Sequence, residues 1–425
     1  MSTLAARPPA TGLRGDAAVI GLVGLAHSVS HFSQLLLAPL FPWLKDAFHV
    51  SYAELGLLMS IFFVVSCAVQ ALAGFLVDRI GPRPVLFGGI GLLGLAALGF
   101  AASQSWWMLA GFSVLAGIGN GVFHPVDFTL LNRKVAQARL GHAFSVHGIT
   151  GNLGWAAAPA LLVPLAYAFS WRVALLAAAA LAFTVLAVLW FNRERLALAP
   201  LAAAPAASQA RGAEHSLAFL TIPAVWMCFA FFLFFAMALS GVQAFAPEAA
   251  RQLHDVPQRL AGMCLSIYML CSAGGMIAGG FLIADPARCE KVVAAGFGAA
   301  ALIALTLGMA DLAPLAVPVL FGAMGFATGL AGPSRDLIVK RSAPDNATGR
   351  VYGVVYSGLD IGQAIAPLIF GALMDLHRPA AVWFGIALVQ AVIVSTAFNV
   401  RRVRRTALAP VESGLGPERR LPSPA

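Results

Sequence analysis

Two long apolar runs, residues 52–77 and 84–102, are separated by a short polar segment, and this arrangement restricts the fold more than any other feature. Each run is long enough to cross a hydrocarbon core of roughly 30 Å as an α-helix. The segment between them reads Gly74-Phe75-Leu76-Val77-Asp78-Arg79-Ile80-Gly81-Pro82-Arg83. Gly81 permits a positive φ and Pro82 lacks an N–H group, so both favour a tight turn. We therefore expect two antiparallel membrane-spanning helices joined at the membrane surface.

The sequence around this hairpin recurs in the second half of the chain. Small and apolar residues between Gly56 and Leu76 reappear between Gly262 and Leu282, 206 positions later. A second set recurs with an offset of 208 positions and comprises Gly117, Gly121, Pro125, Gly141, Gly154 and Pro159. A repeat of this period predicts two similar halves of about six spans each, in the same orientation.

Composition and charge also indicate a membrane protein. Of the 425 residues 60% are hydrophobic and 11% are charged, whereas about a quarter would be charged in a soluble domain. The net charge of +9 would suggest nucleic-acid binding in a soluble protein. Here 22 of the 27 Lys and Arg fall on the side of the membrane that carries both termini, and five fall on the other. Because positive residues stay on the cytoplasmic side, this bias predicts cytoplasmic termini and no nucleic-acid partner.

The domain organisation follows from the spans and from the segments between them. We expect an N-terminal six-helix half at 1–192, a cytoplasmic linker at 193–218, a C-terminal six-helix half at 219–400 and a basic cytoplasmic tail at 401–425. The linker is rich in Ala and Pro, which favours a loose connection over a domain. No cleavable signal precedes the first span, so that span should direct insertion.

Polar side chains inside the spans are the functional candidates, because ionisable groups in a bilayer usually face a cavity. His27, His31 and Gln34 have the spacing i, i+4, i+7 in the first span, so they share one helical face. The fourth span repeats this spacing with Asn120, His124 and Asp127. The remaining candidates are His147 and Asn152 in the fifth span, Gln243 in the seventh, Arg335 in the tenth, and Asp360 and Gln363 in the eleventh.

Two roles suit these residues. Histidine changes charge near neutral pH, and an apolar cavity favours the neutral form of a carboxyl group, so both suit proton coupling. The proton-coupling candidates are therefore His27, His31, His124, Asp127, His147 and Asp360, and the substrate-cavity candidates are Gln34, Asn120, Asn152, Gln243, Gln363 and Arg335. For each of them the alternative is a structural hydrogen bond, and Arg335 could simply pair with Asp336. No nucleotide-binding loop, cofactor motif or metal-like spacing occurs, and the five cysteines follow no ligand pattern.

Two sets of residues resemble a known family. The pattern Gly74-x-Leu76-x-Asp78-Arg79-x-Gly81-x-Arg83 resembles the loop between the second and third helices of the major facilitator superfamily. The runs 119–125 and 148–154, together with His31-Phe32, Gln34, Pro39 and Pro42, are similar to the fosmidomycin-resistance group of bacterial drug exporters. Departures are Ser33-Gln34, where that group carries an acid and an amide, and Asp127, which is displaced from its position after the His-Pro pair.

The resemblance implies an all-α membrane protein with twelve transmembrane helices in two six-helix halves. Helices one, four, seven and ten would line the central path. The residues Gly74, Asp78, Arg79, Gly81 and Arg83 would form a gating motif, in which Asp78 faces the N-terminal end of helix eleven near Gly349.

The sequence thus predicts a secondary transporter of the bacterial inner membrane. We expect a proton-coupled antiporter that exports a small drug or metabolite, acts as a monomer and uses no cofactor. The alternative is a proton-coupled importer of a small carboxylate or other organic anion. A membrane sensor or scaffold is disfavoured because no signalling domain is evident. An enzyme is disfavoured because no nucleophile–base pair or metal-ligand cluster appears.

Overall fold

The computed structural model describes residues 12–198, 223–282, 289–342 and 348–408. Twelve of its segments are helical, long and apolar enough to cross a membrane, as the sequence predicts. The helices of the N-terminal half are α1 (Leu13–Gln34), η1 (Ala38–Leu40), α2 (Phe41–Phe48), α3 (Tyr52–Ile80), α4 (Pro82–Ala102), α5 (Trp106–Asn120), α6 (Phe123–Lys134), η2 (Gln137–Arg139), α7 (Leu140–Ala168), α8 (Trp171–Phe191) and η3 (Arg193–Leu196).

The C-terminal half contains α10 (Pro223–Ala244), α11 (Ala246–His254), α12 (Gln258–Leu282), α13 (Cys289–Met309), α14 (Ala316–Ser342), α15 (Thr348–Asp375) and α16 (Pro379–Leu408). α16 continues past the boundary expected at residue 400, into the basic tail. The first residues of the expected linker form η3, in which Leu196 is fully buried and the Arg195 carbonyl accepts a hydrogen bond from Lys134 at 2.7 Å. Residues 199–218 of the linker are outside the described residues.

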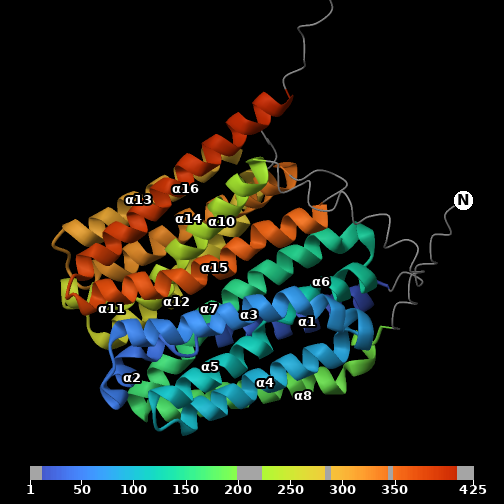
Figure 1. Cartoon of the computed structure of the whole chain (residues 1–425), viewed down its shortest axis with the longest axis horizontal. Helices are drawn as coiled ribbons and strands as arrows, with labels where there is room; N and C mark the ends of the chain where they lie inside the picture. Colours follow the sequence, from blue (N-terminus) through green and yellow to red (C-terminus); the bar gives the residue numbers. More distant parts are fainter. Residues whose placement is uncertain (1–11, 199–222, 283–288, 343–347, 409–425) are drawn as a thin grey trace, which may run out of the picture.

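The two halves lie side by side, and each contributes one layer of the bundle in Figure 1. The start of α1 and the end of α16 lie at the same end of the bundle, on the right of the view, which we call the terminal end. The short helices α2 and α11 lie at the opposite end, which we call the distal end. The chain therefore crosses the bundle in alternating directions, and α3 and α15 run antiparallel to each other.

Two of the expected spans are interrupted. The first ends as a regular helix at Gln34, and Pro39 and Pro42 lie in η1 and α2, because a proline cannot continue a helix in which its N–H is needed. The fourth is divided into α5 and α6, which are separated by Gly121 and Val122. Pro125 lacks the N–H that would pair with the Gly121 carbonyl, which accounts for this break. The break places His124 and Asp127 on the first two turns of α6.

The halves contact each other closely along the distal part of the bundle. Gly56 of α3 packs directly on the backbone of Pro367 in α15, where no side chain would fit. The Ser60 hydroxyl donates to the Ala364 carbonyl of α15 at 2.6 Å. On the other side of the bundle, the Ser266 hydroxyl of α12 donates to the Ala156 carbonyl of α7 at 2.9 Å. Both seams between the halves are therefore held by backbone contacts that only small residues permit.

A carboxylate closes the distal end between α15 and α3. Asp375 accepts hydrogen bonds from the backbone N–H groups of Tyr52 at 2.8 Å and Ala53 at 2.9 Å. Ser51 and Glu54 satisfy each other's N–H groups in a capping box within the same turn. Since a helix begins with N–H groups that lack intrahelical partners, Asp375 completes the cap of α3 from the other half.

The terminal part of α3 is much less covered. Between Tyr52 and Ser66 its buried residues lie on several faces, whereas beyond Ser66 only Ala73 and Val77 are buried. Gly74 has no atom within 4 Å of where a side chain would begin, and Asp78 is exposed. Among the described residues, the halves are thus in close contact at the distal end of α3, whereas most of its terminal end is exposed.

Candidate functional site

Five of the six proton-coupling candidates lie together inside the N-terminal half. Asp127 of α6 is fully buried, and the same carboxylate oxygen, Oδ2, is 3.0 Å from His27 Nδ1 of α1 and 3.0 Å from His147 Nε2 of α7. The rings of His27 and His147 stack with their centroids 3.6 Å apart. The other carboxylate oxygen, Oδ1, is buried and has no hydrogen-bond partner. One carboxylate therefore joins three helices of this half.

The rings of His31 and His124 also lie close to the His27 ring. The His27 centroid is 4.3 Å from that of His31 and 5.6 Å from that of His124. His31, one turn after His27 on α1, also contacts the Trp155 ring at 4.2 Å, and its Nδ1 has no hydrogen-bond partner. One ligand atom from each of His27, His31 and His124 lies within 4.8 Å of the others, as do those of His27, Asp127 and His147. Sequence spacing did not predict a grouping that could hold a metal ion.

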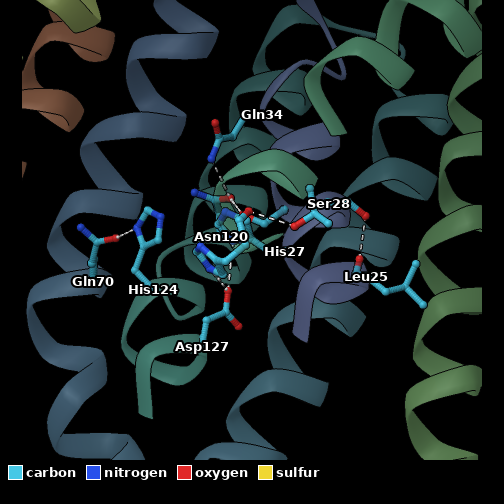
Figure 2. A network of polar contacts seen from close by, with 11 residues as sticks. Leu25, His27, Ser28, Gln34, Gln70, Asn120, His124 and Asp127 are labelled. Atoms are coloured by element: carbon cyan, nitrogen blue, oxygen red, sulfur yellow. Dashed lines mark hydrogen bonds and ion pairs between the residues drawn. The ribbon is translucent and has the colours of Figure 1, made fainter. Parts of the chain in front are cut away.

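The sixth candidate, Asp360, reaches this cluster through a residue that the sequence analysis missed. Gln70 of α3 donates from Nε2 to Asp360 Oδ2 of α15 at 3.1 Å, and its Oε1 lies 2.8 Å from His124 Nδ1. Figure 2 shows His124 between Gln70 on one side and His27 with Asp127 on the other. The Cys67 thiol also contacts the Asp360 carboxylate. A hydrogen-bonded chain thus runs from α15 in one half through α3 to α6 in the other, where the His124 ring lies near the His27 ring of α1.

A second polar network adjoins the histidines toward the distal end. Asn120 of α5 accepts from Ser30 at 2.7 Å, receives a longer contact of 3.5 Å from Gln34, and donates to Ser66 at 2.8 Å. Gln34 in turn accepts from Trp155 Nε1 at 3.0 Å. Two substrate-cavity candidates, Gln34 of α1 and Asn120 of α5, are therefore in contact with each other and hydrogen-bonded to two further helices, α3 and α7.

In the part of the chain that the structure describes, the other substrate-cavity candidates contact residues outside these two networks. Asn152 of α7 donates to the Gly148 carbonyl and contacts Met276 Sδ of α12 at 3.0 Å. Gln363 donates to Gln243 at 3.3 Å, and both amides keep one buried atom without a partner. Arg335 lies over the Phe235 ring at 4.5 Å and the Phe232 ring at 5.3 Å. The Asp336 side chain, its expected partner, is outside the described residues.

The contacts of Asn152 and Asp360 repeat the internal duplication. Asn152 and Asp360 are 208 positions apart, and their partners Met276 and Gln70 are 206 positions apart. Each pair bridges the two halves at equivalent places in the fold. Only one of the two pairs contains a carboxyl group, so the halves differ chemically where their architecture is the same.

The gating-motif residues lie at the terminal end. Gly81 has a φ of +86° between α3 and α4, which agrees with the turn expected there. Arg83 is 3.7 Å from Glu194 in an exposed ion pair. Asp78 and Arg79 are exposed. The side chains at the start of α15, including the region of Gly349 that Asp78 is expected to face, are outside the described residues.

Comparison with known proteins agrees with this architecture. A family model described as Major Facilitator Superfamily matches residues 23–367. The fosmidomycin resistance protein of Escherichia coli (strain K12) is 29% identical over 155 residues, which cover 36% of this chain and 37% of that protein. The match is thus confined to less than half of either chain.

Two further relatives have names that refer to anions. The probable sulfoacetate transporter SauU of Cupriavidus necator is 26% identical over 178 residues, which cover 41% of each chain. The probable nitrate/nitrite transporter NarK2 of Mycobacterium tuberculosis (strain CDC 1551 / Oshkosh) is 25% identical over 376 residues, which cover 85% of this chain and 90% of that one. The relatives thus include a drug-resistance protein as well as anion transporters.

Proposed function

This chain belongs to the major facilitator superfamily. We propose that it transports a small organic molecule across the bacterial inner membrane and that this transport is coupled to protons. It is a transporter and not an enzyme. Transport proceeds by alternating access, in which one half rocks against the other around a site between them. The proton that drives transport binds at Asp360.

The observation that carries this proposal is the hydrogen bond between Gln70 and Asp360. It joins α3 of one half to α15 of the other, so rocking of the halves must stretch or break it. An amide donates more strongly to an ionised carboxylate than to a neutral acid. Protonation of Asp360 therefore weakens a contact between the halves, which links the proton to the conformation.

The sidedness of the bundle follows from its basic residues. The five Lys and Arg that lie at the distal end are Lys45, Arg172, Arg251, Arg259 and Arg378. The other Lys and Arg of the described helices lie toward the terminal end, so we assign that end to the cytoplasm. In this orientation the distal seams close the protein toward the outside.

Two carboxylates on antiparallel helices serve as reciprocal gates. Asp375, at the C-terminal end of α15, caps α3 at the distal end. Asp78, near the C-terminal end of α3, is exposed here and caps α15 near Gly349 when the cytoplasmic side closes. Because a carboxylate is stabilised by the positive end of a helix, each gate favours one of the two states.

Export of a drug or metabolite is the favoured direction, because the motifs in α1, α6 and α7 resemble the fosmidomycin-resistance group. A second function, import of a small organic anion, has separate support. Arg335 provides a positive charge between Phe232 and Phe235, and two relatives are named for anions. Gln243 and Gln363 each keep an unpaired buried amide atom that a substrate could satisfy.

The experiment uses purified protein in proteoliposomes that contain a pH-sensitive dye. A thermal-stabilisation screen with fosmidomycin, other drugs and small carboxylates first selects a ligand. Addition of that ligand should then cause proton movement. Protons should move in the same direction as the ligand if the protein is an importer, and in the opposite direction if it is an exporter. Asp360→Asn should abolish the proton movement, whereas Asp311→Asn, at an exposed carboxylate of the distal end, should not. Ligand transport without any proton movement in the wild-type protein would refute the coupling.

A further inference from the structure

Three imidazole rings converge in the N-terminal half without a hydrogen bond between them. They belong to His27 and His31 on α1, spaced one turn apart, and to His124 on α6. We infer that these three side chains form a binding site for a divalent transition metal ion of the Zn²⁺, Co²⁺ and Ni²⁺ class. The inference concerns what the histidines bind, and it does not depend on proton coupling at Asp360.

The hydrogen bonds around His124 determine which of its nitrogens is free. When Asp360 is ionised, its Oδ2 can only accept from Gln70, so the Gln70 amide N–H₂ faces Asp360 and its Oε1 faces His124. His124 Nδ1 must then carry the hydrogen, because Gln70 Oε1 is an acceptor. The lone pair of the neutral ring is consequently on Nε2. Metal-binding histidines usually donate the N–H of one ring nitrogen to such an acceptor, which leaves the lone pair of the other nitrogen for the metal.

His27 is oriented in the same way by a carboxylate. Its Nδ1 lies 3.0 Å from Asp127 Oδ2 and donates to it, so its lone pair is on Nε2. This arrangement corresponds to the carboxylate–histidine–metal relationship found in zinc sites. His31 is the third ligand; its buried Nδ1 has no hydrogen bond of ordinary geometry, although its ring also interacts with the Gly151 backbone. A buried polar nitrogen without a partner is costly, and a cation would satisfy it.

Gly151 of α7 leaves the space in which two of these nitrogens meet. A Cβ atom at this position would lie 2.8 Å from His31 Nδ1 and 3.1 Å from His27 Nε2. Both distances are closer than ordinary packing allows, so any larger residue would displace the imidazoles. The absence of a side chain at Gly151 thus lets the two nitrogens lie side by side.

A second group, His27, Asp127 and His147, also has its ligand atoms within 4.8 Å of one another. There both histidines already donate to the same carboxylate oxygen, and their rings stack face to face. Stacked rings do not direct two lone pairs at one point. We therefore assign the metal to His27, His31 and His124, and the second group to orienting His27.

The choice of metal follows from the donors. Neutral imidazoles suit zinc, nickel, cobalt and copper, whereas Mg²⁺ and Ca²⁺ prefer oxygen ligands. Bonds of about 2.0–2.1 Å to zinc would place the nitrogens about 3.4 Å apart in a tetrahedral site. From separations of at most 4.8 Å, small rotations of the three side chains would suffice. Three protein ligands leave a fourth position for water or another molecule.

The test is a titration of purified, tag-free protein with Co²⁺, whose visible absorption reports tetrahedral coordination. The wild-type protein should bind one Co²⁺ with this spectrum, and Zn²⁺ should displace it. His31→Gln should remove the spectrum. His142→Gln, the same change at an exposed histidine of α7, should leave it unaltered.

A second pair of variants guards against misfolding. Gly151→Ala retains all ligands and should weaken binding, and Asp127→Asn, which alters the partner of His27, should weaken it about 10- to 100-fold. Melting curves without metal establish that each variant is folded. The inference is overturned if the wild-type protein shows no tetrahedral Co²⁺ spectrum, or if folded His31→Gln and His124→Gln variants keep it.

Discussion

Replacement of Asp375 by Ala should open the distal end. The side chain accepts two hydrogen bonds from the first turn of α3, at 2.8 and 2.9 Å. Its negative charge is also stabilised by the positive end of that helix. Loss of a helix cap costs about 0.5–2 kcal/mol, and loss of a charge near the helix terminus about 0.3–1 kcal/mol. Because these contributions overlap, we expect a combined effect of about 1–2 kcal/mol. Because Asp375 lies in the C-terminal half and caps a helix of the N-terminal half, its loss should destabilise the state in which the halves are in contact at the distal end, which we call the distal-closed state.

An effect of this size should lower the ratio of distal-closed to distal-open molecules about 5- to 30-fold. Spin-labelled amino acids at Ala47 and Asp311, which are exposed on opposite halves at the distal end, would report the change as a distance distribution. The labels leave the five native cysteines in place. A longer distance should appear or grow in the variant, at the expense of the shorter one.

Ser51→Ala is the matched control. Ser51 caps the same helix through a hydrogen bond to the Glu54 N–H, but all of that contact lies within one half. The control should therefore reduce stability by a similar amount and leave the distance distribution unchanged. The reasoning is refuted if Asp375→Ala also leaves the distribution unchanged, or if Ser51→Ala shifts it equally.

Three further predictions concern the seams, the gate and the linker. Gly56→Ala should disfavour the distal-closed state, because the added Cβ would collide with the Pro367 backbone; the same labels would measure this. Gly111→Ala should not change the distance distribution, because no atom lies within 4 Å of the added Cβ there. Asp78→Asn should slow transport in proteoliposomes with expression and melting temperature nearly intact, and a wild-type rate with an unaltered distance distribution would contradict its gating role. A Gly/Ser segment in place of residues 199–212, which leaves the buried Leu196 of η3 intact, should preserve transport by correctly inserted protein, and loss of transport would reveal an ordered element there.

The fold could be predicted from the sequence because hydrophobic length and internal repetition act at long range in the chain. A run of about 20 apolar residues has few alternatives to a spanning helix. The repeat also predicts that Asn152 and Asp360 occupy equivalent positions in the two halves. Helix breaks were less predictable, since the effect of Pro39 and Pro125 depends on whether neighbouring helices satisfy the released backbone groups.

The candidate site was predicted only in part. Helical spacing grouped His27 with His31 and His124 with Asp127, because residues on one helix face are fixed by its geometry. Which faces meet depends on tertiary packing, so the joint contact of His27 and His147 with Asp127 did not follow from spacing. Gln70 was missed although it is a lone amide in an apolar span, which is itself a usable signal. Asp375 was missed because a cap contributed by another helix leaves no local pattern.

The most direct test of proton-coupled alternating access is the pH dependence of the distal distance without substrate. Labels at Ala47 and Asp311 would be measured across the pH range in which the protein stays folded. Since a proton on Asp360 weakens its hydrogen bond from Gln70, acidification should lower the distal-closed fraction of the wild-type protein. Asp360→Asn should resemble the acidified wild-type protein at every pH and lose the response. An unchanged wild-type distribution, or an equal pH response in the variant, would contradict coupling at Asp360.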